Sequence, residues 1–249
     1  MDLAHASSSE HLRGLRVAIT GGTSGLGLAL TRALTACGAR VAFVARNRDR
    51  VEHTAREIPG AHGIVGDIAR KDEIHPIAMQ ILGRLGGLDV LVNNASSLGP
   101  TPLALLADTE CEDFELALQT NLLGPFRLTR ALLGALTASA RDGRAPLVLN
   151  ISSDAANNAY AGWGAYSASK AALQHMSRIW DEELGAHGVR VLAADPGDMD
   201  TPLHAAAVPD ADPATLKRPE DAARELLELI ASPLLPSASR TSPAEASVA

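Results

Sequence analysis

Short apolar runs alternate with longer amphipathic stretches along most of the chain. Runs rich in Val, Ile, Leu and Ala predict buried strands at 17–20, 41–44, 64–65, 90–92, 147–149 and 189–192. The stretches between them predict helices ending at 37 and spanning 49–57, 74–85, 108–136 and 166–184. Strands separated by helices of this length indicate right-handed βαβ units, with helices on both faces of the sheet. The pattern predicts an α/β fold: a three-layer, doubly wound parallel sheet of six or seven strands.

The longest predicted helix, 108–136, contains Gly124-Pro125 near its middle. Proline removes a helical hydrogen bond, so we expect an irregularity near Asn121. Residues 14–232 are expected to form one catalytic domain. A flexible N-terminal tail (1–13) precedes it, and a loosely ordered, Ser-, Ala- and Pro-rich C-terminal tail (233–249) follows. Because this last stretch lacks a strand pattern, a seventh strand stays open.

Composition narrows the class of protein. Hydrophobic residues make up 46% of the chain and aromatic residues only 3%, so the core is built from small and aliphatic side chains. The net charge of −7 disfavours nucleic acid as a partner. Cys37 and Cys111 are far apart, which indicates neither a disulfide framework nor a metal site. Without a secretory signal or an apolar run of membrane-spanning length, we expect a cytoplasmic protein that is not bound to a membrane.

A glycine-rich turn follows the first predicted strand, in the order Thr20-Gly21-x-x-x-Gly25-x-Gly27. Glycines at such a turn allow a backbone to approach a pyrophosphate, and the N-terminus of the next helix offers free N–H groups to the anion. The alternative is an ordinary glycine-rich turn. We assign the phosphate site to Gly21, Thr23, Ser24, Gly25, Leu26 and Gly27.

The end of the second predicted strand indicates which dinucleotide binds. A carboxylate there would bind the 2′-hydroxyl of the adenosine ribose, but the residues are Ala45 and Arg46. A guanidinium is suited to a 2′-phosphate, which favours NADP(H) over NAD(H); the alternative is that Arg46 is simply solvated. Asp67 and Ile68 follow the third strand and are also assigned to the cofactor site. Asp67 either accepts a hydrogen bond from the adenine amino group or only caps a turn.

Tyr166 and Lys170 are four residues apart on a predicted helix and therefore share a face. A neighbouring ammonium is expected to lower the pKa of a phenol, as proton transfer to and from a carbonyl oxygen requires. Ser153 ends the fifth strand, where its hydroxyl can polarise the same oxygen. Ser152 is its rival, since adjacent strand residues point to opposite faces and only one can face the site.

Together with Asn93-Asn94-Ala95, Asn121 and Pro196-Gly197, these motifs resemble the short-chain dehydrogenase/reductase family in order and spacing over about residues 15–230. The resemblance selects Ser153 over Ser152. It implies a Rossmann fold, a nicotinamide cofactor and a catalytic tetrad of Asn121, Ser153, Tyr166 and Lys170. Tyr166 would be the general acid in reduction, while Lys170 would lower its pKa and bind the nicotinamide ribose. Asn121 would hold a water linked to Lys170. The resemblance adds cofactor contacts at Asn93, Ala95, Tyr166, Lys170, Pro196, Gly197, Met199 and Thr201.

Some positions depart from the family pattern or fall in its variable parts. Ser96 stands where the family usually has Gly, and the loop between Thr201 and Pro219 is short. The segment before Tyr166 contains Tyr160 and Trp163, which either stack on a flat substrate or, for Trp163, pack beneath the helix. Ser153, Tyr160, Trp163 and Tyr166 are therefore our substrate-site residues. Gly162-Trp163 also gives a weak similarity to sepiapterin-reductase-like members.

These observations predict an NADP-dependent oxidoreductase, a ketoreductase that transfers hydride between nicotinamide and a carbonyl or secondary alcohol. Its partners would be a small carbonyl or alcohol substrate and further copies of the chain in a homodimer or homotetramer. Two alternatives stay open: a non-catalytic NADP(H)-sensing or scaffold protein, and a redox-neutral epimerase or dehydratase on the same fold.

Overall fold

The computed structural model describes residues 11–232. The predicted tail segments 1–10 and 233–249 lie outside the described residues. The strands are β1 (Arg16–Thr20), β2 (Arg40–Ala45), β3 (Ala61–Val65), β4 (Val90–Asn93), β5 (Leu147–Ile151) and β6 (Arg190–Ala194). The α-helices are α2 (Gly25–Ala36), α3 (Arg48–Glu57), α4 (Ile74–Leu85), α5 (Cys111–Leu118), α6 (Gly124–Arg141), α7 (Gly164–Gly185), α8 (Pro202–Ala207) and α9 (Pro219–Ala231). Short 3-10 turns include η4 (Asp154–Ala156).

The six strands formed by the described residues make one parallel sheet in the order β3-β2-β1-β4-β5-β6. The predicted doubly wound parallel sheet is therefore confirmed. The order reverses between β1 and β4, because the chain first builds outward to β3 and then returns to the other side of β1. In such sheets the crevice at this reversal is where ligands bind.

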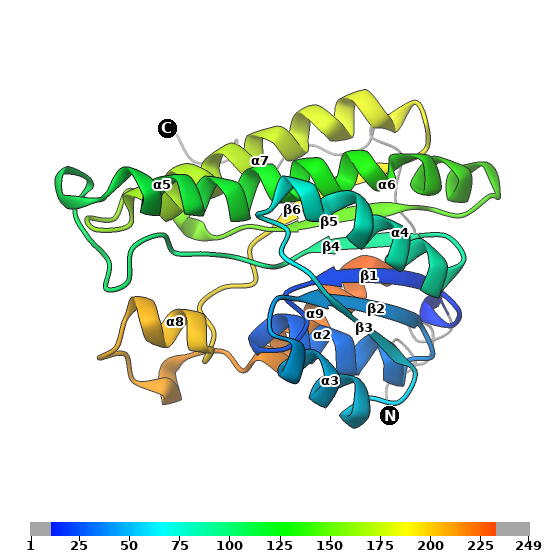
Figure 1. Ribbon diagram of the computed structural model, residues 1–249, viewed down its shortest axis with the longest axis horizontal. Helices are drawn as coiled ribbons and strands as arrows, with labels where there is room; N and C mark the ends of the chain where they lie inside the picture. Colours follow the sequence, from blue (N-terminus) through cyan, green and yellow to red (C-terminus); the bar gives the residue numbers. More distant parts are fainter. Residues whose placement is uncertain (1–10, 233–249) are drawn as a thin grey trace, which may run out of the picture.

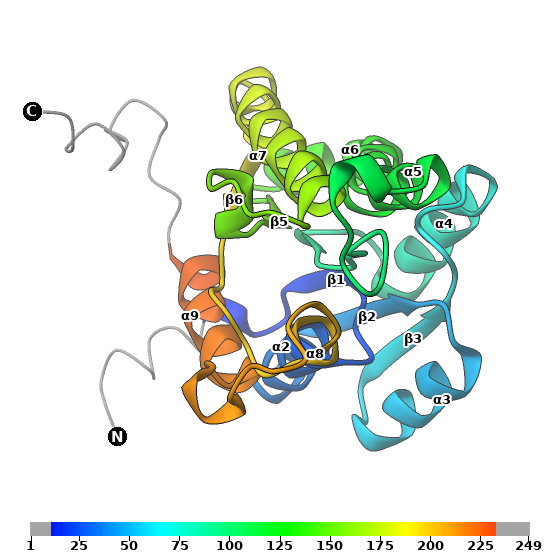
Figure 2. The same cartoon turned by 90° about the vertical axis from the view of Figure 1, so that its left-hand side faces the viewer.

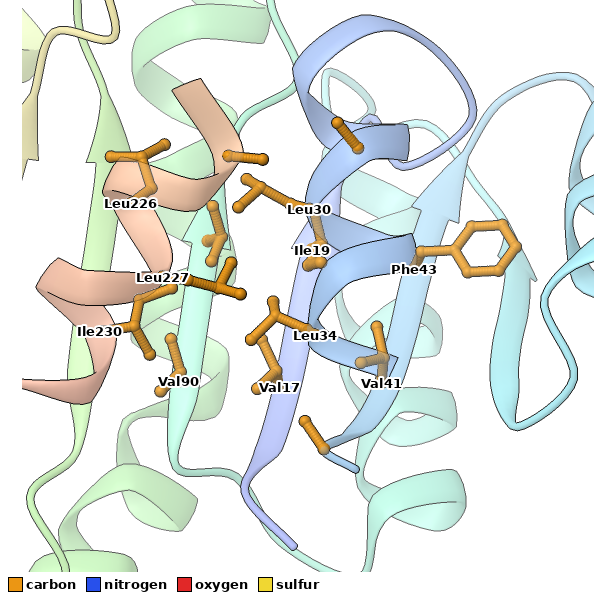
Figure 3. Packing of buried hydrophobic residues seen from close by; sticks show 14 of the residues in the cluster. Val17, Ile19, Leu30, Leu34, Val41, Phe43, Val90, Leu226, Leu227 and Ile230 are labelled. Atoms are coloured by element: carbon orange, nitrogen blue, oxygen red, sulfur yellow. The ribbon is translucent and has the colours of Figure 1, made fainter. Parts of the chain in front are cut away.

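Helices cover both faces of the sheet (Figures 1 and 2). Helices α2, α3 and α9 lie on one face, and α4, α6 and α7 lie on the other. Alternate strand residues point to opposite faces, so Val17 and Ile19 join the first hydrophobic cluster while Ala18 joins the second. Figure 3 shows Leu30 of α2 and Leu226 of α9 within the first cluster. Since both faces of the sheet are buried, the strands consist of continuous apolar runs in the sequence.

The helix predicted at 108–136 is interrupted. It consists of α5, a π-helical turn at Gln119–Leu123, and α6, which extends to Arg141. In a regular helix the amide of Pro125 would bond the carbonyl of Asn121, but proline has no N–H. The expected irregularity near Asn121 is confirmed, whereas the single continuous helix was wrong.

Packing extends further toward the N-terminus than residue 14. Leu12 is only 1% exposed and belongs to the first hydrophobic cluster. The Gly14 amide donates to the Gly38 carbonyl at 2.9 Å, which fixes the entry into β1. Within residues 11–232, no helix combines the length and apolarity needed to span a membrane.

Candidate active site

A cleft of about 760 Å³ opens where all six strands end at their carboxyl termini. Parallel strands bring these ends to one edge of the sheet, so segments far apart in sequence meet there. Most of the predicted site residues line the cleft: Gly21, Thr23, Ser24, Gly25, Leu26, Arg46, Asp67, Ile68, Ala95, Ser153, Tyr160, Trp163, Tyr166, Lys170, Pro196, Gly197, Met199 and Thr201. Three do not line it, namely Gly27, Asn93 and Asn121. Gly27 packs against Gly21, and Asn121 hydrogen-bonds Ser96 and Ser97, which all line the cleft.

The turn between β1 and α2 has the geometry of a phosphate-binding loop. Gly21 has a φ of +73°, a conformation that side chains other than glycine rarely adopt, and its amide donates to the Val44 carbonyl at 2.8 Å. Gly27 faces away from the cleft, and a Cβ there would collide with the Gly21 carbonyl. Gly27 thus permits close contact between α2 and the turn rather than contact with a ligand.

Asn94, rather than Asn93, faces the cleft. The amides of Asn94 and Ala95 both donate to the Thr20 hydroxyl at 3.0 Å, and the Asn94 side chain donates to the Thr20 carbonyl at 2.9 Å. Asn93 is buried and donates to the Asn150 side chain at 2.8 Å. The predicted contact from Asn93 is therefore replaced by a structural bond between β4 and β5, because neighbouring strand residues point to opposite faces.

The far end of the cleft carries positive charge. Arg46 and Arg50 both line it and are both exposed, just beyond the end of β2. Asp67 also lines this end, and its carboxylate accepts a hydrogen bond from the Ala69 amide at 2.9 Å. Asp67 therefore caps its turn, as one of the two readings expected. The glycine turn and the two guanidinium groups suit a ligand that carries phosphate groups.

Ser153, Tyr166 and Lys170 come together on the opposite wall. Tyr166 is 7% exposed and Lys170 2%, and the ammonium lies 5.5 Å from the centre of the phenol ring. The Lys170 ammonium donates to the Ile151 carbonyl at 2.7 Å, which holds α7 against the end of β5. The Ser153 hydroxyl accepts from the Ala155 amide at 3.2 Å as the chain enters η4. Ser153 thus lies at the start of a turn that holds its side chain in place.

Burial governs the proton affinities of this pair. Burial raises the pKa of Tyr166 to about 12, although interactions with the Ser153 and Ser96 hydroxyls oppose the rise. Burial also lowers the pKa of Lys170 to about 8, opposed by the charge of Asp195. Desolvation therefore dominates the pKa of Tyr166 in the protein alone, and the predicted effect of the Lys170 charge on that pKa stays a prediction. A phenol with this pKa is a proton donor at neutral pH.

Asn121 is 1% exposed and fully hydrogen-bonded. Its side-chain oxygen accepts from the Ser97 amide at 2.8 Å and from the Ser96 hydroxyl at 3.2 Å. Its side-chain nitrogen donates to the Ser97 carbonyl and to the Ser169 hydroxyl, both at 2.8 Å. With all four positions occupied, the amide anchors the loop after β4 to α7.

Three aromatic rings form one side of the cleft. Trp163 packs against Tyr166 with ring centres 5.6 Å apart and against Tyr160 with centres 6.5 Å apart. Trp163 also lines the cleft, so it packs structurally while its stacking on a substrate stays a prediction. Tyr160 is 46% exposed, and its hydroxyl donates to the Asp154 carboxylate at 2.7 Å.

The segment after β6 closes the remaining side. The Thr201 hydroxyl accepts a hydrogen bond from the His204 amide at 3.2 Å and so caps α8. A Cβ at Gly25 would lie 3.0 Å from the Thr201 methyl group, so the phosphate turn and this segment are in close contact. The site is thereby bounded by β1 on one side and by the β6 loop on the other.

Two residues that our sequence-based site lacked also contribute. Ser96 bonds Asn121 and interacts with the Tyr166 phenol, and the departure from the family's glycine was the available signal. Asp154 lines the cleft and accepts from the Ser153 hydroxyl at 3.1 Å. Nothing in the strand or helix pattern marks Asp154, because its contact depends on the turn at η4.

Comparison with known proteins identifies the class. The family model for short chain dehydrogenase matches residues 16–212. The chain belongs to the short-chain dehydrogenase family. This membership confirms the resemblance inferred from the motifs and makes the protein an oxidoreductase of that family.

Members of the short-chain dehydrogenase family resemble the chain over most of its length. It is 30% identical to L-xylulose reductase from Bos taurus over 199 residues, covering 80% of this chain and 78% of the relative. A 3-ketoacyl-(acyl-carrier-protein) reductase from Brucella melitensis, complexed with NADH, superposes with a TM-score of 0.82 at 28% identity, covering 89% of this chain and 92% of that one. A Burkholderia cenocepacia short chain dehydrogenase complexed with NADP gives a TM-score of 0.79 at 26% identity, covering 90% and 92%. A nicotinamide cofactor is thus supported for this chain.

Proposed function

We propose that the protein is an NADP(H)-dependent ketoreductase in which Tyr166 is the general acid. The observation that carries this proposal is one cleft that joins a glycine-rich phosphate turn and Arg46 to a wall holding Ser153, Tyr166 and Lys170. The relatives named above include an L-xylulose reductase and a 3-ketoacyl reductase with NADH bound, and a short chain dehydrogenase with NADP bound. Preference for NADP(H) depends on the guanidinium groups at the end of β2, where a carboxylate would be needed to bind an unphosphorylated ribose.

The chain's own residues would position and protonate the substrate. The turn at 21–26 and Arg46 would hold the phosphates, and the loop at 196–201 would lie beside the nicotinamide. When bound, that group supplies the hydride. Ser153 would donate a hydrogen bond to the carbonyl oxygen, and Tyr166 would give that oxygen its proton. The raised pKa of Tyr166 keeps this proton in place at neutral pH until negative charge develops on the oxygen.

Lys170 would act from behind Tyr166. Its ammonium is fixed by the Ile151 carbonyl and lies against the phenol ring. A positive charge there stabilises the phenolate that forms when the proton leaves. Asn121 would act as a positioning residue that ties the β4 loop to α7 through Ser97 and Ser169. A homodimer or homotetramer and a cytoplasmic location stay predictions.

The test is oxidation of NADPH by the purified protein against a panel of ketones and diketones, with NADH run in parallel. We expect one NADPH consumed for each alcohol formed. Tyr166→Phe should abolish this turnover while the Kd for NADPH changes by less than about threefold, since only a hydroxyl is lost. Turnover by the Phe variant would remove Tyr166 from its role. Tight NADPH binding without carbonyl reduction would instead favour a sensor, and product formation without NADPH consumption would favour redox-neutral chemistry.

A further inference from the structure

The hydroxyl of Ser153 has a charged neighbour that the proposed reaction does not require. It donates to Asp154 Oδ1 at 3.1 Å, and the Tyr160 hydroxyl donates to Oδ2 of the same carboxylate at 2.7 Å. The Asn158 side chain holds the Asp154 carbonyl at 3.3 Å, which fixes the turn that carries this residue. The carboxylate is therefore held in place from two sides, directly beside the hydroxyl that would bind the substrate carbonyl.

The Asp154 carboxylate is placed to bind a substrate donor. The Tyr160 hydroxyl is the main group that lowers the pKa of Asp154, and Ser153, Ala155 and Asn158 contribute, so the group is ionised at neutral pH. Asp154 is exposed and lines the cleft, which leaves its carboxylate accessible to a substrate that replaces the Ser153 hydrogen.

The end of the cleft that contains Asp154 carries negative charge. Besides Asp154, the cleft is lined here by Asp195 and Asp198, and both Asp154 and Asp198 act electrostatically on Tyr160. The arginines that line the cleft, Arg46 and Arg50, belong to its opposite end. A substrate whose group beside the carbonyl is anionic would meet repulsion, whereas one that offers a hydrogen-bond donor would find an acceptor.

We propose that the substrate is an α-hydroxy ketone whose carbonyl oxygen is bound by Ser153 and Tyr166. The single hydroxyl hydrogen of Ser153 then turns from Asp154 to that carbonyl oxygen, and the substrate hydroxyl takes its place as donor to Asp154. Oxygens on adjacent carbons stand about 3 Å apart when they lie on the same side of the bond, as ordinary C–C and C=O lengths dictate. This separation matches the 3.1 Å between Ser153 Oγ and Asp154 Oδ1, so each protein oxygen can meet one substrate oxygen. The inference rests on the proposed ketoreductase function and deepens it.

The reaction balances as a reduction. The carbonyl carbon gains a hydride from the reduced nicotinamide, and the carbonyl oxygen gains the proton of Tyr166, which is then replaced from solvent. The product is a vicinal diol and the nicotinamide leaves oxidised. The hydroxyl bonded to Asp154 is unchanged, so Asp154 determines specificity and takes no part in the proton transfer.

The test uses matched aromatic ketones, because the cleft has an aromatic wall. We would measure kcat and KM with NADPH for α-hydroxyacetophenone, α-methoxyacetophenone, acetophenone and phenylglyoxylate. The methoxy compound keeps the electron-withdrawing oxygen but cannot donate, so the hydroxy-to-methoxy ratio of kcat/KM isolates the hydrogen bond. A hydrogen bond to a charged group predicts a ratio of about ten or more, carried mainly by KM, and phenylglyoxylate should be the poorest substrate.

Variants assign the preference to Asp154. Asp154→Asn should reduce the hydroxy-to-methoxy ratio of kcat/KM by about tenfold. Because the ratio compares two substrates of one variant, any loss of activity common to both substrates cancels. Asp198→Asn removes the same charge from the same cleft without touching Ser153, and it should leave the ratio unchanged. Tyr160→Phe frees one carboxylate oxygen from its anchor and should lower the ratio by a smaller factor than Asp154→Asn.

The outcomes separate the two proposals. A hydroxy-to-methoxy ratio near one in the wild type, with every ketone reduced, would overturn the inference and leave the ketoreductase function intact. Equal loss of the ratio in Asp154→Asn and Asp198→Asn would also overturn it, since general charge would then explain the preference. Failure of the wild type to reduce any carbonyl compound would overturn the ketoreductase function, and the inference with it.

Discussion

Replacing Lys170 with methionine should stabilise the protein at pH 7 while removing its activity. Lys170 is fully buried, and its pKa falls from 10.5 to about 8 on folding. At 1.36 kcal/mol per unit, this shift of about 2.5 units means that the folded state holds the charged lysine at a cost of about 3 kcal/mol. Methionine removes that cost, fits a similar length, and leaves the Ile151 carbonyl without its partner, which costs about 1–3 kcal/mol. We therefore expect a net gain of about 1 kcal/mol at pH 7.

The pH dependence makes this prediction specific. The lysine pKa is depressed in the folded state, so the destabilisation is fully present below pH 8 and is relieved as pH rises from about 8 toward 10.5. Between these values the unfolded chain binds more protons, and the stability of the wild type rises with pH relative to the variant. At pH 9.5 the wild type should have regained about 2 kcal/mol, so that it becomes the more stable of the two.

The assay is urea unfolding of both proteins at pH 7 and pH 9.5, at one protein concentration so that any association affects them equally. Tyr166 should not confuse the comparison, because its pKa of about 12 keeps it protonated in both folded proteins at pH 9.5. A difference in unfolding free energy that is the same at both pH values would refute the reasoning. Lys170 would then be uncharged at neutral pH, or water would reach its ammonium despite its burial.

Three further results are expected. Arg46→Ala should raise the Kd for NADPH by about tenfold or more and that for NADH by less than about threefold, measured by nicotinamide fluorescence, while Arg48→Ala, outside the cleft, changes neither; equal losses for both cofactors would place the 2′-phosphate elsewhere. Asp89→Asn should lower the free energy of unfolding by about 3 kcal/mol, because the carboxylate is 1% exposed and bonds Arg16 at 2.6 Å. Although burial raises the pKa of Asp89, the hydrogen bonds from Arg16 and Ser139 and the Arg16 charge together outweigh it and leave the pKa below its ordinary value. The wild type alone should therefore lose this stability as pH falls below about 4. For ketone reduction, kcat/KM should decline above pH 8 as Lys170 loses its charge, and a flat profile up to pH 10 would contradict that role.

The sheet could be predicted from sequence because its strands are buried on both faces and form unbroken apolar runs. The third strand was predicted only at 64–65, whereas β3 begins at Ala61. His62 and Gly63 interrupt the apolar run, and pairing with Ala42 and Phe43 of β2 overrides their low strand propensity. The break within the long helix was predictable because proline has no N–H to donate to a helical hydrogen bond.

The convergence of Ser153, Tyr166 and Lys170 on one wall of the cleft was predictable, because it depends on helical spacing and on the end of a strand. It was harder to predict which of two neighbouring residues at the end of a strand faces the cleft, as Asn93 and Asn94 show. Successive side chains point to opposite faces of the sheet, and the sequence pattern does not reveal which residue points to which face. Asp154 was missed because its role arises from contacts with Ser153 and Tyr160 across a turn. The rise in the pKa of Tyr166 could not be predicted, because it results mainly from burial, which is a property of the folded site and not of the local sequence.

Because the strand order reverses between β1 and β4, the two sides of the site come from different parts of the sequence. The phosphate turn, Arg46 and Asp67 all come from the first third of the chain, whereas Ser153, Tyr166 and the 196–201 loop come from the last two fifths. The hydrogen bonds between Thr20 and Asn94 join the turn after β1 to the end of β4, which lies between the two stretches in sequence. Under the proposed function, nucleotide choice and carbonyl choice would be encoded in separate stretches of sequence. Exchange of one stretch by recombination at the crossover into β4 would alter one preference and leave the other in place, a modularity open to evolution and to engineering alike.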